Sequence, residues 1–71
     1  MKKIVFIFNN DSTLDNIPQS FIGDDLNSIQ NYLTNNGVQN LEFDDDIATF
    51  NHNDLGSDIG GATYYELEYV N

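Results

Sequence analysis

Carboxylates dominate this chain, and any fold it adopts must overcome their repulsion. Its 71 residues contain twelve acidic and only two basic side chains, a formal net charge of −10. Both basic residues, Lys2 and Lys3, lie at the N-terminus, so His52 is the one later side chain that can become positive. Charge of one sign keeps a protein soluble and attracts basic partners, but it opposes compaction. A small apolar core must therefore supply the stability.

Length and composition predict a single folded domain over residues 1–71. A chain this short buries only about 60% of its unfolded surface, and it has no cysteine for disulfides or thiolate metal sites. Hydrophobic residues nevertheless make up 39% of the chain and aromatic residues 13%, more than a disordered chain carries. The apolar run 4–8 is too short for a signal peptide or for a membrane span of about 20 residues. We expect a cytoplasmic protein.

Apolar runs and period-two alternation predict four strands. Residues 3–8 are almost continuously apolar and suit a strand buried on both faces. Residues 38–43 and 47–51 are expected to form a hairpin around an acidic turn, residues 44–46. The clearest alternation lies in residues 62–70. There we expect Thr63, Tyr65, Leu67 and Tyr69 to point inward and Tyr64, Glu66 and Glu68 to point outward.

One helix is predicted within residues 20–35. Asp24 and Asp25 are expected in its first turn, where carboxylates meet the positive end of the helix dipole. Gly23 either caps the helix or lies inside its first turn, and Gly37 suits the left-handed residue that ends it. The apolar residues of the helix recur at i, i+4, i+7 and i+11 and form one stripe: Ile22, Leu26, Ile29 and Leu33.

These elements predict an α+β fold of order β-α-β-β-β, in which one helix packs on a mostly antiparallel four-stranded sheet with the first strand central. Leu14 and Ile17 are expected to attach the loop at 9–19 to the core. Val5 and Ile7 lack a predicted covering layer, so a homodimer through them or through an open sheet edge is a further expectation. The expected core is Ile4, Phe6, Phe8, Ile22, Leu26, Ile29, Leu33, Leu41, Phe43, Phe50, Tyr65, Leu67 and Tyr69.

The sequence does not favour catalysis. It contains neither cysteine nor arginine, and the one Ser/His/Asp set, Ser57, His52 and Asp54, lies in a single loop without a rigid nucleophile turn or an oxyanion hole. We expect no enzyme, no catalytic residue and no cofactor. Direct binding to nucleic acid or to an anionic membrane is also not expected, because both require basic surface.

A metal site is likewise not expected. The loop 51–58 matches a calcium loop at its first, third and sixth positions. However, Leu55 occupies the fifth position, where an oxygen ligand belongs, and Ala62 the twelfth, where a bidentate carboxylate belongs. His52 could contribute only one nitrogen ligand. A divalent-cation-binding module at this loop or at the turn 44–46 is the least favoured alternative.

The outer face of the last strand is the candidate binding surface. Tyrosine commonly anchors protein interfaces, and flanking carboxylates steer a basic partner. A solvated face whose charges prevent edge pairing is the alternative without a binding role. The expected partner-binding residues are Tyr64, Glu66, Glu68, Glu42, Asp44, Asp45, Asp46, Asp24 and Asp25.

The expected function is that of a non-enzymatic acidic module that occupies a basic surface on a partner protein. Its most specific form is a DNA-mimic inhibitor of a nucleic-acid-binding enzyme, which rests on size and charge and on no motif. A toxin-immunity protein and a structural or oligomeric assembly subunit are the alternatives. The net charge favours binding over a passive surface.

Overall fold

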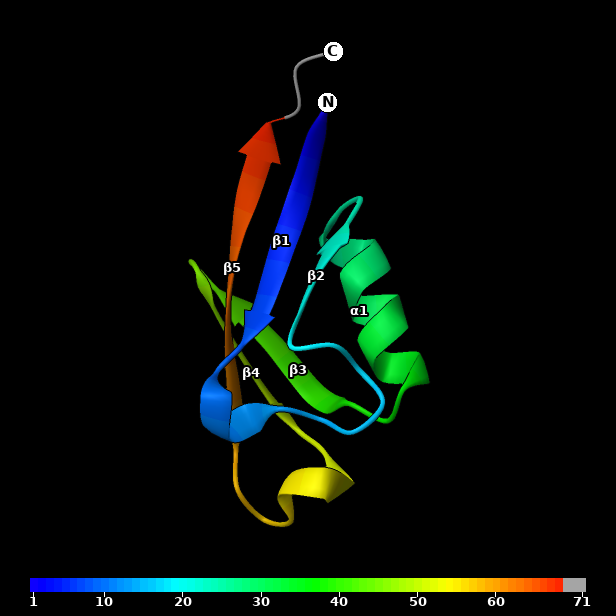
Figure 1. The fold of residues 1–71 in the computed structure, drawn as a ribbon, viewed down its shortest axis with the longest axis vertical. Coiled ribbons are helices and arrows are strands. Elements are labelled where there is room, and N and C mark those ends of the chain that lie inside the picture. Colours follow the sequence, from blue (N-terminus) through cyan, green and yellow to red (C-terminus); the bar gives the residue numbers. More distant parts are fainter. Residues whose placement is uncertain (69–71) are drawn as a thin grey trace.

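The computed structural model describes residues 1–68 and shows, within them, one α-helix packed on a five-stranded antiparallel sheet (Figure 1). The predicted small α+β class is confirmed, with one strand more than expected. The bounds are β1 Lys2–Phe8, β2 Ser20–Gly23, α1 Leu26–Asn35, β3 Gln39–Asp44, β4 Ile47–Asn51 and β5 Gly60–Glu68, with short 3₁₀ helices at Asn10–Ser12 and Asn53–Leu55.

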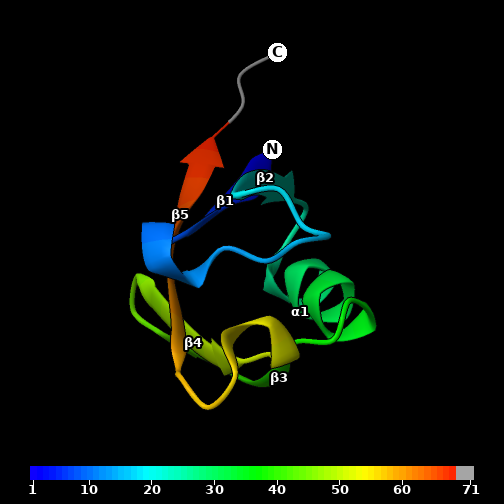
Figure 2. The same cartoon turned by 60° about the horizontal axis from the view of Figure 1, so that its bottom comes forward.

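The strand order is β2-β1-β5-β4-β3, so β5 is central and the expectation of a central first strand is wrong. β1 pairs with β5 over residues 62–68, whereas β4 pairs with it over residues 60–63. The two neighbours of β5 therefore overlap only at Ala62 and Thr63. The sheet consists of two halves that are offset along β5 and share this strand. Figure 1 and Figure 2 both show the offset.

The helix lies within the predicted range 20–35, but the strand β2 corrects the assignment of Ile22 to its apolar stripe. Ile22 falls on the helical stripe by spacing, but it lies opposite Val5 of β1, on the sheet face away from the helix, and is 52% exposed. Phe21 instead faces the helix, where its ring contacts Tyr32 at 5.0 Å between centroids. This segment is extended rather than helical because its pairing with β1 supplies backbone hydrogen bonds to an otherwise open edge of the sheet.

Asp25 determines where the helix begins. Its carboxylate accepts a hydrogen bond from the Ser28 backbone N–H at 2.7 Å, so Asp25 is the N-cap. Asp24 precedes the cap, and neither aspartate is in the first turn as expected. The C-terminal end agrees with the prediction, since Gly37 has φ +91° and its N–H donates to the Thr34 carbonyl.

The core lies between α1 and one face of the sheet. It is built around edge-to-face aromatic contacts of Phe8, whose ring centroid is 5.1 Å from Phe6 and 5.5 Å from Phe50. Gly60 lies against Phe50, and a Cβ at this position would collide with the ring. The expected burial of Leu14 and Ile17 is confirmed. Other buried residues that agree with the prediction are Ile4, Ile29 and Leu33; Val38, Ala48 and Ala62 were not predicted.

The faces of β5 are the reverse of those predicted. Ile4 pairs with Glu66 and Phe6 with Tyr64, which places Glu66 and Tyr64 on the helix side of the sheet. Tyr65 and Leu67 consequently lie on the outer face, where they are 51% and 37% exposed. Assignment of these two residues and of Ile22 to the core is therefore wrong, and Tyr69 lies outside the described residues. Leu26, Leu41 and Phe43 are partly buried against the core.

Alanine substitutions at Ile29 and Ile22 should differ in their cost. Ile29 is 1% exposed, so Ile29→Ala should lower the free energy of unfolding by about 2–5 kcal/mol. Ile22→Ala should cost less than about 1 kcal/mol, since the side chain is half in solvent. Urea unfolding of both variants measures the difference. An equally large loss of unfolding free energy in both variants would contradict the strand assignment. It would indicate that Ile22 and Ile29 lie on the same buried helix face.

Candidate functional site

Six of the nine residues predicted to bind a partner line one groove of about 720 Å³. We call it the acidic groove, and it lies between the start of α1, the β3–β4 turn and the helix-side face of β5. Its floor includes Ile4 and its wall Leu26, so apolar carbon surface lies among the carboxylates. The six residues are Asp24, Asp25, Asp45, Asp46, Tyr64 and Glu66.

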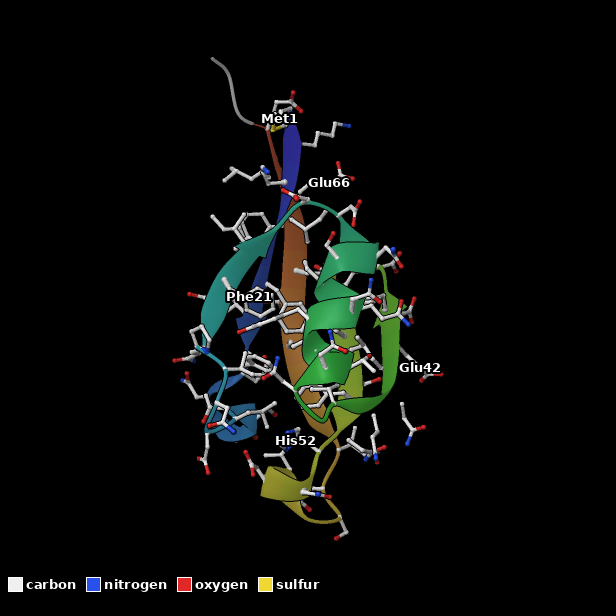
Figure 3. All side chains as sticks on the ribbon, turned by 90° about the vertical axis from the view of Figure 1, so that its right-hand side faces the viewer. Met1, Phe21, Glu42, His52 and Glu66 are labelled. Carbon is white, nitrogen blue, oxygen red and sulfur yellow. The ribbon has the colours of Figure 1, made fainter. Side chains whose placement is uncertain are left out.

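Three predicted residues lie outside the acidic groove. Asp44 is the last residue of β3, and the Glu68 carboxylate is 3.3 Å from the terminal amine of Met1. Glu42 pairs with Thr49 of β4 and lines a different depression beside Asn51. Figure 3 shows Glu66 near the end of the molecule where the helix begins, with Glu42 well away from it along β3.

A tight turn brings the acidic run to the groove. Asp44 pairs with Ile47, so only Asp45 and Asp46 connect β3 to β4. Asp45 adopts a left-handed conformation with φ +56°, which Asp tolerates better than most residues. The Tyr64 backbone N–H donates to the Asp46 carbonyl at 3.0 Å and holds the turn against β5. The sequence predicted a turn at residues 44–46, but it did not show that this turn lies against Tyr64 of β5.

Tyr64 is the aromatic side chain that meets this turn. Its ring packs edge-on against Phe43, with 5.1 Å between centroids. Burial raises the pKa of the Tyr64 phenol above the ordinary 10.0, and the negative charges of Asp45, Asp44 and Asp46 raise it further. The phenol therefore keeps its proton at neutral pH and presents a hydrogen-bond donor among carboxylates.

Asp25 contributes a fixed negative charge to the other wall. The hydrogen bond from the Ser28 backbone N–H is the main cause that lowers the pKa of Asp25 below its ordinary 3.8. Because the folded state lowers this pKa, the contribution of the Asp25 cap to the free energy of unfolding is complete above pH 3.8. It is lost as the pH falls through the lowered pKa of the folded state. The carboxylate is ionised throughout the physiological range.

Both lysines of the chain reach carboxylates of the groove. The Lys2 ammonium is 3.6 Å from Glu66, and the Lys3 ammonium forms an ion pair with Asp24. Glu66 and Asp24 are largely solvent-exposed, so each pair contributes only about 0–1 kcal/mol. Of the two lysines, Lys2 itself lines the groove.

His52 and its loop have structural roles. The Asp54 N–H donates to His52 Nδ1, so the ring proton is on Nε2, which donates to the Asn36 carbonyl at 3.0 Å. The Asp54 carboxylate accepts the Asp15 N–H at 3.0 Å. The loop thus uses these polar groups to join the end of α1 to the segment after β1. Among residues 1–68, no three His, Cys, Asp or Glu side chains are grouped to hold a metal ion.

The sheet face opposite α1 carries a second surface, which we call the outer apolar face. Ile22, Val5 and Tyr65 form one row across three strands, and Ile7 and Ile47 flank Thr63 in another. Ile22, Tyr65 and Ile47 are each about half exposed, at 52%, 51% and 53%. The helix α1 packs on the opposite face of the sheet and does not cover this one (Figure 2). The two residues that the sequence indicated on this face are less exposed: Val5 is buried at 9%, and Ile7 is intermediate.

Comparison of the chain with protein-family models, curated proteins and solved structures finds no match with any of the three. Within residues 1–68, α1 is too short and too polar to cross a membrane. Functional inference therefore depends on the geometry and charge of the two surfaces described above.

The Tyr64 phenol should report the charge of the turn. Asp45→Asn removes one negative charge and keeps a residue that tolerates φ +56°, so the Tyr64 pKa should move down toward 10.0. The contribution of the protonated Tyr64 phenol to the free energy of unfolding is complete below pH 10.0. It is lost as the pH rises through the raised pKa of the folded state. NMR titration of the labelled phenol measures the shift, with Asp58→Asn as the matched control. Equal effects of the two variants would contradict the proximity.

Proposed function

We propose that the chain is a non-enzymatic, acidic protein-binding module whose acidic groove receives basic side chains of a partner protein. The observation that carries the proposal is the convergence of carboxylates from three separate segments on one groove around Tyr64. Like charges repel, so their convergence costs stability in the free protein. A cationic partner would relieve this cost on binding.

The composition of the groove supports lysine or arginine side chains as its occupants. Carboxylates at the rim attract the charged group, and the carbon surface of Ile4 and Leu26 suits the aliphatic stem. Lys2 and Lys3 already place ammonium groups beside Glu66 and Asp24. Because these exposed pairs are weak, a partner's cations can replace them at little cost.

The specific form of this proposal is inhibition by DNA mimicry, in which the carboxylates occupy the nucleic-acid groove of an enzyme. A toxin-immunity protein would use the same surface against one toxin. Competition with nucleic acid distinguishes the two forms. Nucleic acid should displace a DNA mimic, because both would occupy the same site on the partner enzyme. A dedicated immunity complex should resist salt and bind a single protein.

A groove with three fewer negative charges should bind the partner more weakly. The triple variant Asp24→Asn/Asp45→Asn/Asp46→Asn and the control Glu42→Gln/Asp15→Asn/Asp58→Asn remove equal charge, inside and outside the groove. Affinity capture from host lysate with nuclease present, at low and high salt, identifies the partner. Its association rate should fall at least about tenfold for the groove variant at low ionic strength and much less for the control.

Two results would contradict the groove as the binding site. One is an equal loss of binding in both triple variants, which would show that only net charge matters. The other is a smear of basic proteins that washes away with salt, which would indicate a generic acidic surface. Unfolding curves of both variants establish that each is folded.

The outer apolar face favours a second candidate function, an assembly subunit that pairs with its own copy. One sheet face carries three large side chains that are each about half exposed: Ile22, Ile47 and Tyr65. An exposed apolar patch on a soluble protein often marks an interface. Sedimentation equilibrium should show a dimer that Ile47→Lys converts to monomer, with Asp58→Asn as control. A monomeric wild-type chain at its highest soluble concentration would contradict this candidate.

A further inference from the structure

Among residues 1–68, the C-terminal half of β5 has a neighbouring strand on one side only. β1 pairs with β5 as far as Glu68, but β4 pairs with it only up to Thr63. The hydrogen bond from the Tyr64 N–H to the Asp46 carbonyl is the last one on the β4 side that the described residues provide. In Figure 1 the upper half of β5 accordingly has β1 on one side and no strand on the other.

The backbone groups that face this open edge can be assigned. In an antiparallel sheet, the N–H and C=O of one residue point to the same side, and successive residues alternate. The Gly61 carbonyl accepts the Asn9 N–H on the β1 side, and the Tyr64 N–H donates on the β4 side. Continuing the alternation, Glu66 and Glu68 direct their N–H and C=O groups away from β1.

We propose that an extended basic segment of the partner protein adds as a strand to the open edge of β5 beside Glu66 and Glu68, in line with β4. This inference rests on the proposed function and specifies how the acidic groove is filled. Backbone hydrogen bonds at a sheet edge supply affinity, and the alternating side chains supply specificity. Residues 64–68 span about 17 Å, the length of an ordinary strand.

The faces of β5 define the sequence of such a segment. Alternate side chains of the added strand would lie beside Tyr64 and Glu66 at the acidic groove, and the others beside Tyr65 and Leu67 on the outer face. The first set suits lysine or arginine and the second suits apolar residues. The partner segment should therefore alternate basic and apolar residues.

Charge also excludes a second copy of this chain from the edge. Two copies paired here would bring the carboxylates of Glu66 and Glu68 against each other, and like charges across a strand pair are destabilising. Acidic side chains on an edge strand are a common protection against self-pairing. The same carboxylates attract a cationic strand, so the edge discriminates between the two occupants by charge.

A synthetic peptide of about nine alternating lysine and valine residues tests the inference on the isotope-labelled full chain. Binding should slow hydrogen exchange at the Glu66 and Glu68 amides. It should leave the Tyr65 and Leu67 amides little changed, because these already face β1. One control peptide has the same composition with the lysines in a single block. The other is the alternating peptide with N-methyl groups at the backbone positions that face β5.

The N-methylated and block peptides should bind at least about tenfold more weakly than the alternating peptide, with no protection at Glu66 and Glu68. Equal binding of all three peptides to the groove, with exchange at these amides unchanged, would overturn strand addition and leave the proposed function standing. If no lysine peptide perturbs either the groove or the edge, both proposals fail.

Discussion

The pairing of β5 on both of its sides is the interaction on which the rest of the structure depends. β1 and β4 use different stretches of this strand and overlap only at Ala62 and Thr63. Each half of the sheet would be a marginal ribbon without the other, because isolated hairpins rarely persist in water. Gly60 permits the close approach of Phe50 that joins the lower half to the aromatic core.

The same offset creates the acidic groove and the open edge of β5. Because β4 stops pairing at Thr63, its turn lies beside Tyr64 and carries the acidic run 44–46 to the middle of the molecule. Above that point β5 is left with an open edge. The start of α1 supplies Asp24 and Asp25 from the other side. Repulsion among these groups is concentrated where a cationic ligand can relieve it, and a ligand that binds only the folded state would stabilise the fold.

Several predictions from the sequence agree with the structure because local chemistry determines them. The strand at 47–51, the end of the helix before Gly37 and the burial of Leu14 and Ile17 all follow from nearby residues. The strand at 20–23 was not predicted, and Ile22 was assigned to the helix stripe because it satisfies a helical spacing by coincidence. Only the open edge of β1, which is distant in sequence, explains why this segment is extended.

By itself, the sequence determined the charge, the small α+β class and the helix stripe from Leu26 to Leu33. Tertiary structure decided which face of β5 is inward. Alternation alone indicated the wrong face, because Glu66 and Glu68 make the Tyr64 side of the strand the more polar one. Register with β1 settled it, since Phe6 and Ile4 must face the helix and their partners Tyr64 and Glu66 follow them. That register, set by pairing between segments about 60 residues apart, placed Tyr64 and Glu66 on the side of the acidic groove.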